Sequence, residues 1–233
     1  YIEMGGEKRY LPDRKLRTTD YSISDVYGTG FYQEIVDTLE ELNYARYSLG
    51  TEKYLKPEYR DQRKYQDLST MGQNLRGLLK SNFLKRLESS IFAFSQTLDR
   101  TLTSYRNFYR LLDEDVVAIG EKINEMLKSD DDPEEILDEM EDLEAGETQD
   151  YDIDAFYLDP LKQDLKEDID RLEKRNDRVQ SIIEEIFDEY EKDDKLKELR
   201  SLLSDLYDGD HELLDGEESA DKIIIFTEYG DTV

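Results

Sequence analysis

A repeat of apolar residues from Leu84 to Met126 constrains the fold more than any other feature of the chain. Apolar side chains recur there in alternating steps of three and four, and Thr101 is the weakest member. The span has no proline and a single glycine, Gly120, so nothing in it forces a break. A mean step of 3.5 residues over about six heptads predicts one continuous helix, on the order of 65 Å long, that presents one seam to a partner helix.

A second repeat further along the chain supplies the expected partner. Its apolar positions run from Leu165 to Tyr190 in the same steps, with Asn176 as the polar exception. A polar residue in such a seam can fix the register of a coiled coil, or Asn176 can simply be tolerated near the helix surface. The two repeats predict a mainly α fold. Its helices form an antiparallel coiled-coil hairpin or an elongated helical bundle, with short terminal β-strands.

The charge is distributed unevenly. The 233 residues carry a formal net charge of −28, which argues against nucleic-acid binding by the surface as a whole. Residues 75–110 nevertheless hold seven basic side chains against two acidic ones, whereas residues 121–160 hold seventeen acidic side chains against two basic ones. The acidity therefore belongs mainly to the predicted arm, whose tip we place at 129–160, and the body is locally basic.

The basic segment offers candidate contacts with nucleic-acid phosphates, because such contacts need only Lys and Arg on one face. A solvated helix face is the competing interpretation for each of these residues. Together with one residue of the last apolar run, the candidates are Arg76, Lys80, Lys85, Arg86, Arg110 and Thr227.

Residues 1–74 are expected to form an N-terminal region that begins with an irregular lead-in. A strand is predicted at 15–23, and an amphipathic helix starts near Tyr32. We expect this helix to stop near Gly50, and an irregular or partly helical connection to follow at 51–74.

A helical insertion is expected to occupy 75–210 and to finish with a leucine-rich helix that ends at Asp208. A polar linker follows at 211–221. Residues 222–233 read KIIIFTEYGDTV, and their apolar run is typical of a strand buried on both faces of a parallel sheet. Since a lone strand cannot complete a sheet, we interpret the chain as a fragment that stops inside a sheet domain.

Three segments of the chain have counterparts in one known family. They read LPDRKLRTTDYSI, LLKSNFLKRLESSIFAFSQTL and KIIIFTEYGDTV, and they cover about a fifth of the chain. In this order they resemble the strand that leaves the first lobe, the helix that precedes the second lobe, and the opening strand of the second RecA-like lobe in Swi/Snf-type superfamily 2 helicases. The resemblance implies that 222–233 begin a truncated RecA-like lobe, that the chain is the spacer between two motor lobes, and that the acidic arm is a lineage-specific insertion.

The resemblance also implies a parent enzyme that acts on DNA and hydrolyses ATP with magnesium. The chain itself contains neither the phosphate-binding loop nor the magnesium-binding acidic pair that such motors need. We therefore expect no catalytic residue and no cofactor in this segment. No metal is expected either, because the single histidine, His211, has no cysteine or second histidine as a co-ligand.

A different interpretation is an acidic coiled-coil adaptor without motor activity, which would bind a basic protein partner through the arm. The KIIIFT strand discriminates between the two, because an adaptor has no use for it. The expected partners are thus DNA through the parent motor and a protein through the arm. No membrane is expected, since no apolar run approaches roughly 18 residues, and the absence of cysteine favours a cytoplasmic setting.

Overall fold

The computed structural model of the chain describes residues 2–4, 7–9, 18, 20, 22, 27–120, 148–188, 194–208 and 223–225. The fold is mainly α, as predicted. The chain divides into two compact units. One consists of Tyr1–Thr29 with Asp188–Phe226, and the other of Gly30–Phe187 with Thr227–Val233.

The first unit contains a short hairpin and one helix. Strands β1 (Ile2–Met4) and β2 (Glu7–Arg9) pair antiparallel, so the lead-in expected to be irregular has regular structure. Helix α9 (Asp194–Asp208) ends where the leucine pattern predicted. The strand predicted at 15–23 falls largely outside the described residues.

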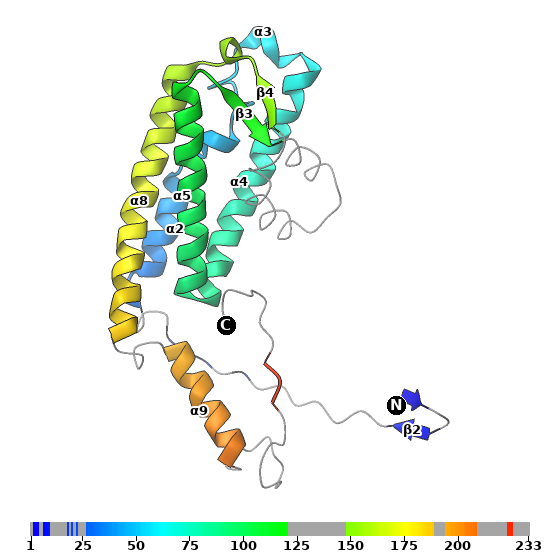
Figure 1. The fold of residues 1–233 in the computed structure, drawn as a ribbon, viewed down its shortest axis with the longest axis vertical. Helices are drawn as coiled ribbons and strands as arrows, with labels where there is room; N and C mark the ends of the chain where they lie inside the picture. Colours follow the sequence, from blue (N-terminus) through cyan, green and yellow to red (C-terminus); the bar gives the residue numbers. More distant parts are fainter. Residues whose placement is uncertain are drawn as a thin grey trace. The chain divides into compact units, whose positions relative to one another are not determined.

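The second unit is a bundle of four main helices that alternate in direction along its length (Figure 1). They are α2 (Phe31–Glu41), α4 (Arg63–Ser89), α5 (Ile91–Asp113) and α8 (Leu158–Asp188). Their apolar faces meet in a core that includes Ile35, Leu39, Phe83, Phe94, Leu98, Leu165, Leu172 and Val179, each no more than 3% exposed. None of the described helices combines the length and the apolar character needed to span a bilayer.

The continuous helix predicted from Leu84 to Met126 is wrong. Ser90 interrupts it with extended backbone (φ −162°, ψ 156°), and the Ser90 Oγ accepts the Ala93 N–H at 3.0 Å to cap the start of α5. Helix α5 then ends at Asp113, and strand β3 (Val117–Gly120) follows. A serine can satisfy backbone groups outside a helix, so an unbroken apolar repeat does not guarantee an unbroken helix. The predicted residues beyond Gly120 lie outside the described part.

The break at Ser90 folds α5 back along α4. The rings of Phe83 and Phe94 pack edge-on across the two helices, with their centroids 5.9 Å apart. Leu87 and Ile91, on either side of the break, are 1% and 0% exposed. Burial of these side chains stabilises the turn, since each apolar side chain removed from water contributes about 1.5–3 kcal/mol.

Helices α5 and α8 run antiparallel, and polar bridges record their alignment. As residue numbers rise along α8, those of the partners fall along α5: Lys162–Asp113 at 2.8 Å, Asn176–Asp99 at 2.7 Å and Gln180–Ser95 at 2.8 Å. Of these α8 residues only Asn176 belongs to the predicted seam, whose apolar members Leu165, Leu172 and Val179 are buried in the core of the bundle.

A small sheet closes one end of the bundle, where β3 pairs antiparallel with β4 (Thr148–Tyr151) and Gly120 lies opposite Thr148. The turn η2 (Ile153–Ala155) and a bridge between Leu55 and Phe156 follow. The tip predicted at 129–160 is therefore too long, because its last part belongs to the core: Tyr151, Ala155 and Phe156 are at most 6% exposed. The tip's remaining residues, 129–147, lie outside the described ranges.

Two further boundaries differ from the prediction. The helix expected to stop near Gly50 ends at Glu41, and the short turn η1 (Ala45–Tyr47) comes after it. The connection expected at 51–74 is mostly helical, since α3 (Pro57–Arg60) precedes α4. In the segment predicted as a strand at 222–233, only Ile223–Ile225 are described, and they lie in no assigned strand.

Candidate functional site

A hollow of about 460 Å³ opens between the end of α2 and the middle of α4. Residues one helical turn apart project to the same side, so Arg76 and Lys80 of α4 lie next to each other. Gly77, the residue after Arg76, also lines the hollow, and a Cβ added there would meet no atom within 4 Å. The residues that line the hollow are Leu39, Glu40, Tyr44, Arg76, Gly77 and Lys80.

The guanidinium group of Arg76 is held by an aromatic ring. Its central carbon lies 5.1 Å from the centroid of the Tyr44 ring, a distance at which the ring face attracts a cation. The Arg76 side chain is exposed. Among the described residues, no hydrogen bond or ion pair engages this guanidinium. Its five N–H donors are thus oriented by the ring and open to a ligand.

Lys80 forms an ion pair across the hollow with Glu40 of α2. Its Nζ lies 2.8 Å from the Glu40 Oε1, and the two side chains are 36% and 60% exposed. Such an exposed pair contributes little to stability, about 0–1 kcal/mol. Arg76 adds a second positive charge, so the residues that line the hollow include two cations and one anion.

The Tyr44 ring is fixed by its own backbone and hydroxyl. Tyr44 adopts the left-handed conformation (φ 53°, ψ 39°), which is costly for a residue with a Cβ and persists only where neighbours enforce it. The hydroxyl donates to the Leu39 carbonyl at 2.7 Å, and the residue is 1% exposed. Burial raises the pKa of the Tyr44 hydroxyl far above its usual range, although the nearby Arg76 opposes the shift. The hydroxyl therefore stays neutral and keeps donating.

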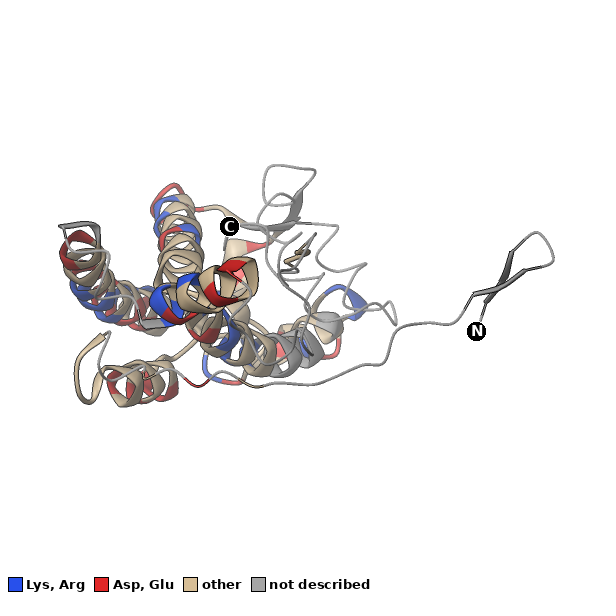
Figure 2. Cartoon of the chain, turned by 90° about the horizontal axis from the view of Figure 1, so that it is seen from below, with Lys and Arg blue, Asp and Glu red and all other residues tan. Residues whose placement is uncertain are grey.

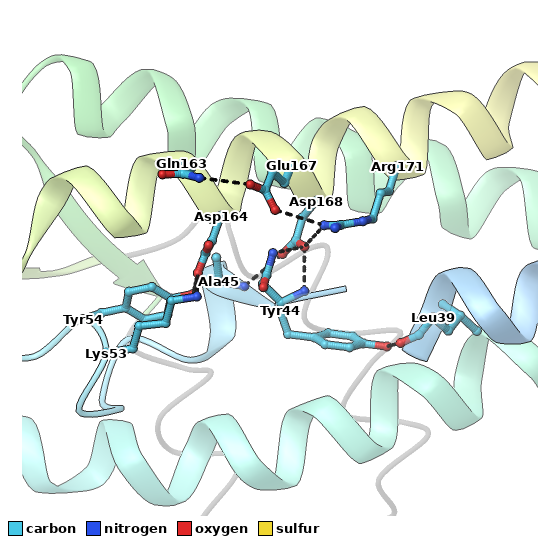
Figure 3. A network of polar contacts seen from close by, with 11 residues as sticks. Leu39, Tyr44, Ala45, Lys53, Tyr54, Gln163, Asp164, Glu167, Asp168 and Arg171 are labelled. Atoms are coloured by element: carbon cyan, nitrogen blue, oxygen red, sulfur yellow. Dashed lines mark hydrogen bonds and ion pairs between the residues drawn. The ribbon is translucent and has the colours of Figure 1, made fainter. Parts of the chain in front are cut away.

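The neighbour that enforces this conformation is Asp168 of α8, which is 0% exposed (Figure 3). Its carboxylate accepts the Asn43 N–H at 2.7 Å and the Ala45 N–H at 3.0 Å, one on each side of Tyr44. Burial raises the pKa of Asp168, and the two N–H donors partly offset the rise. The buried carboxylate thereby pins the turn that presents Tyr44 to Arg76.

A second carboxylate, one turn earlier on α8, holds the next part of the same loop. Asp164 accepts a hydrogen bond from the Tyr54 hydroxyl and pairs with Lys53. Burial and the bond to Asp164 both raise the pKa of Tyr54. Neither Asp164 nor Asp168 lines the hollow. Since both carboxylates bond to the loop, we assign them the role of loop anchors rather than of acid–base groups.

The structure brings together two of the residues predicted to contact nucleic acid, Arg76 and Lys80. Lys85 and Arg86 lie further along α4, where Lys85 is half-buried and Arg86 is only 4% exposed. Arg110 is exposed on α5 but does not line the hollow.

The basic excess of residues 75–110 does not produce a surface of one sign. Arg106 pairs with Glu173 at 2.7 Å, and Lys80 pairs with Glu40, so acidic residues from other helices neutralise part of the excess. Figure 2 shows Lys and Arg interleaved with Asp and Glu along the helices. The sixth predicted contact, Thr227, lies outside the described residues.

The sequence did not identify Tyr44, Glu40 or Gly77 as part of a site. The predicted helix continued through Tyr44, which hid the turn. The one available signal was Asn43, a residue type that often ends a helix when it follows the last apolar position. Nothing in the sequence indicated that Glu40 would face α4.

The described residues contain no group of three or more His, Cys, Asp or Glu side chains placed to hold a metal ion. In comparisons with known proteins, no family model, no curated protein and no solved structure matches the chain.

Proposed function

We propose that the bundle is the helical spacer between the two motor lobes of an ATP-dependent DNA helicase or translocase of the Swi/Snf type. The observation that carries the proposal is the position of the two ends of the bundle. Arg175 of α8 donates to Thr38 at 2.6 Å and to Glu34 at 2.9 Å, which places it beside α2. Gly30 lies about one turn before Glu34, and Phe187 lies about 18 Å beyond Arg175 at 1.5 Å per residue. Both ends therefore leave the bundle on the same side.

This topology suits an inserted domain. A bundle that begins and ends on one side can sit between two chain segments without forcing them apart. The segments on either side of it, Tyr1–Thr29 and Asp188–Phe226, belong to one compact unit. They also contain the first helicase-like segment, 11–23, and the start of the last one at 222.

The exposed isoleucines near the end of the chain support the same proposal. Ile223, Ile224 and Ile225 are 40%, 75% and 59% exposed. Three adjacent apolar side chains of this size gain about 1.5–3 kcal/mol each when they are fully buried. A sheet to which 222–233 would contribute the first strand of a RecA-like lobe provides that burial.

The acidic arm is proposed to bind a protein partner. Residues 121–147 hold thirteen acidic side chains against two basic ones, and they connect the paired residues Gly120 and Thr148. Strands β3 and β4, which flank this segment, lie at the end of the bundle opposite to Gly30 and Phe187 (Figure 1). In the proposal, α5 and α8 are the stem of a coiled-coil hairpin that carries the acidic arm. An adaptor without a motor would use the same arm, and this is the alternative function.

A test on the longer motor polypeptide to which, in the proposal, this chain belongs distinguishes the two functions. In this polypeptide, residues 31–187 are replaced by a short glycine-rich linker. A short linker can join the flanking segments because both ends of the bundle leave it on the same side. The spacer proposal predicts that ATP binding and basal ATP hydrolysis persist, while stimulation of hydrolysis by DNA changes. A complete polypeptide that hydrolyses no ATP, with or without the bundle, contradicts the proposal and favours the adaptor.

A further inference from the structure

We propose that the hollow between α2 and α4 binds a phosphate group through Arg76 and Lys80. This assignment goes beyond the spacer function, because it gives a ligand to a surface of the bundle itself. It holds or fails whichever domains flank the bundle.

The first ground is the fixed orientation of the Arg76 guanidinium group. A guanidinium presents parallel N–H donors that match two oxygens of a phosphate, and it does so best when its plane is already fixed. The buried Tyr44 ring, 5.1 Å below, supplies that fixed position. The ring is itself held by the bonds of Asp168 to the N–H groups of Asn43 and Ala45. This chain of contacts orients Arg76 without using its donors.

The second ground is the pair formed by Lys80 and Glu40. The Glu40 carboxylate already brings an anionic oxygen to 2.8 Å from the Lys80 Nζ at the rim of the hollow. A phosphate oxygen can take that position, because Glu40 is 60% exposed and free to turn toward water. Glu40 therefore competes with the ligand, and its release lets Lys80 and Arg76 act together.

The third ground is the open space at Gly77, beside the two cations. Gly77 has no side chain, and a Cβ built there would meet nothing within 4 Å. A tetrahedral phosphate can approach the helix surface at this point and reach both neighbouring side chains. The excess of one positive charge in the lining favours an anion over a neutral ligand.

Two sources share this chemistry, a phosphodiester of a nucleic-acid backbone and a free phosphate. The test uses the ¹⁵N-labelled chain and follows the Nε–Hε signal of Arg76 and the amide signal of Gly77. Sodium phosphate and a ten-residue thymidine oligonucleotide are added separately. Sodium chloride at equal ionic strength is the control for screening.

The expected result is a saturable shift of both signals with phosphate or oligonucleotide and no comparable shift with chloride. Glu40→Gln removes the competing anion and is expected to tighten binding about two- to fivefold. Arg76→Gln is expected to weaken it about tenfold or more, since hydrogen bonds to charged groups are lost. Arg178→Gln is the matched control, because Arg178 is an exposed arginine of α8 that lies outside the hollow and is not among the candidate contacts, and it leaves binding unchanged.

Saturation by the oligonucleotide at lower concentration than phosphate identifies the backbone as the source, and saturation by phosphate alone identifies a free phosphate. Either result supports the site. Shifts that stay linear, or that occur equally with chloride, overturn it. Weaker binding by Glu40→Gln also overturns it, because Glu40 would then be assisting the ligand. Thermal melts of each variant, followed by circular dichroism, confirm that the fold is retained.

Discussion

The side-chain amide of Asn176 donates to the Oδ1 of Asp99 at 2.7 Å, which joins the one polar seam position of α8 to α5. Its other amide atom, the Asn176 Oδ1, is buried and has no hydrogen-bond partner among the described residues. Two other bridges, Lys162–Asp113 and Gln180–Ser95, hold the same alignment. Asn176 is thus one of several residues that fix the register, and it leaves one buried acceptor unsatisfied.

Replacement of Asn176 by leucine is expected to change the free energy of unfolding by less than about 1 kcal/mol. The change removes the unsatisfied buried oxygen, which costs about 1–3 kcal/mol, and sacrifices one hydrogen bond to a charged carboxylate, worth about 1.5–3 kcal/mol, so the two effects nearly cancel. Urea denaturation measures the difference in the free energy of unfolding. Asp99→Ala, which removes the bond but keeps the buried oxygen, is the control and is expected to be destabilising. A leucine variant destabilised by well over about 1 kcal/mol would show that Asn176 holds the register itself.

Removal of the Asp168 carboxylate is expected to destabilise the bundle by about 3 kcal/mol. Asp168→Ala leaves the N–H groups of Asn43 and Ala45 buried without an acceptor, at about 1–3 kcal/mol each. Asp168→Asn keeps one acceptor oxygen and removes a charge that burial disfavours, as the raised pKa of Asp168 indicates. The Asp168→Asn variant should therefore lose less than half as much free energy of unfolding as Asp168→Ala. Glu167→Gln, one residue away, is expected to stay within about 0.5 kcal/mol in the same urea titration.

Alkaline pH is expected to unfold the chain through its buried tyrosines. Burial raises the pKa of Tyr44, Tyr54 and Tyr105 above the ordinary value of 10.0, so these residues keep their protons in the folded state. The unfolded chain loses them above pH 10, which favours unfolding as the pH rises. Stability should be constant just below pH 10 and fall above it by about 1.4 kcal/mol per pH unit for each tyrosine.

Urea titrations between pH 9 and pH 11.5 measure this slope. Tyr105→Phe is expected to reduce the slope by about 1.4 kcal/mol per pH unit, since one buried tyrosine with a raised pKa is removed. Tyr207→Phe is the matched control, because the Tyr207 side chain is 75% exposed. A slope that does not change in the Tyr105 variant would contradict the assignment.

Deletion of residues 121–147 is expected to leave the bundle folded. An Asn-Gly turn can join Gly120 to Thr148, which lie opposite each other in the hairpin. Shortening a loop reduces the entropy cost of closing it, by roughly 0.6 kcal/mol per halving of its length. A deletion of 129–159, in contrast, removes Tyr151 and Phe156 from the core. Circular dichroism of the two variants should show helix retained in the first and lost in the second.

The isolated chain is expected neither to bind nor to hydrolyse ATP. Its sequence contains no phosphate-binding loop and no acidic pair after a buried strand. Phosphate release is measured with and without DNA, and an unrelated protein purified in the same way gives the background. Hydrolysis by the chain that DNA stimulates above this background would exclude the spacer proposal.

Apolar spacing predicted the helices of this chain better than it predicted their ends. The face of α2 and the seam of α8 lie in the core, as with Ile35 and Val179 at 2% and 0% exposure. The boundary at Ser90 depends on one hydroxyl that caps a new helix, while the apolar repeat continues across it. Beyond α5 the phase is lost, since the repeat member Val116 is only half-buried whereas its neighbour Val117, in strand β3, is buried. Spacing alone could not separate these cases.

The candidate site depends on contacts that sequence separation conceals. Asp168 lies 123 residues from Ala45, and Lys80 lies 40 residues from Glu40. The basic composition of 75–110 predicted Arg76 and Lys80 as contacts, but it also predicted Arg86, which is buried in the fold. The left-handed turn at Tyr44 decides which arginine receives an aromatic support. No pattern in the sequence encodes that turn, because a residue on another helix enforces it.

The shared side of the two bundle ends has a mechanical consequence. A force that pulls Gly30 away from Phe187 does not slide α2 along α8. It peels the two helices apart from their open side, and it loads the bonds of Arg175 to Glu34 and Thr38 before the buried bonds of Asp168. Bonds loaded one after another resist far less force than bonds loaded together. The bundle would thus unfold gradually under tension from its flanking segments. The hydrogen bonds of the fully buried Asp168 would be the first buried contacts to resist the separation of the two helices.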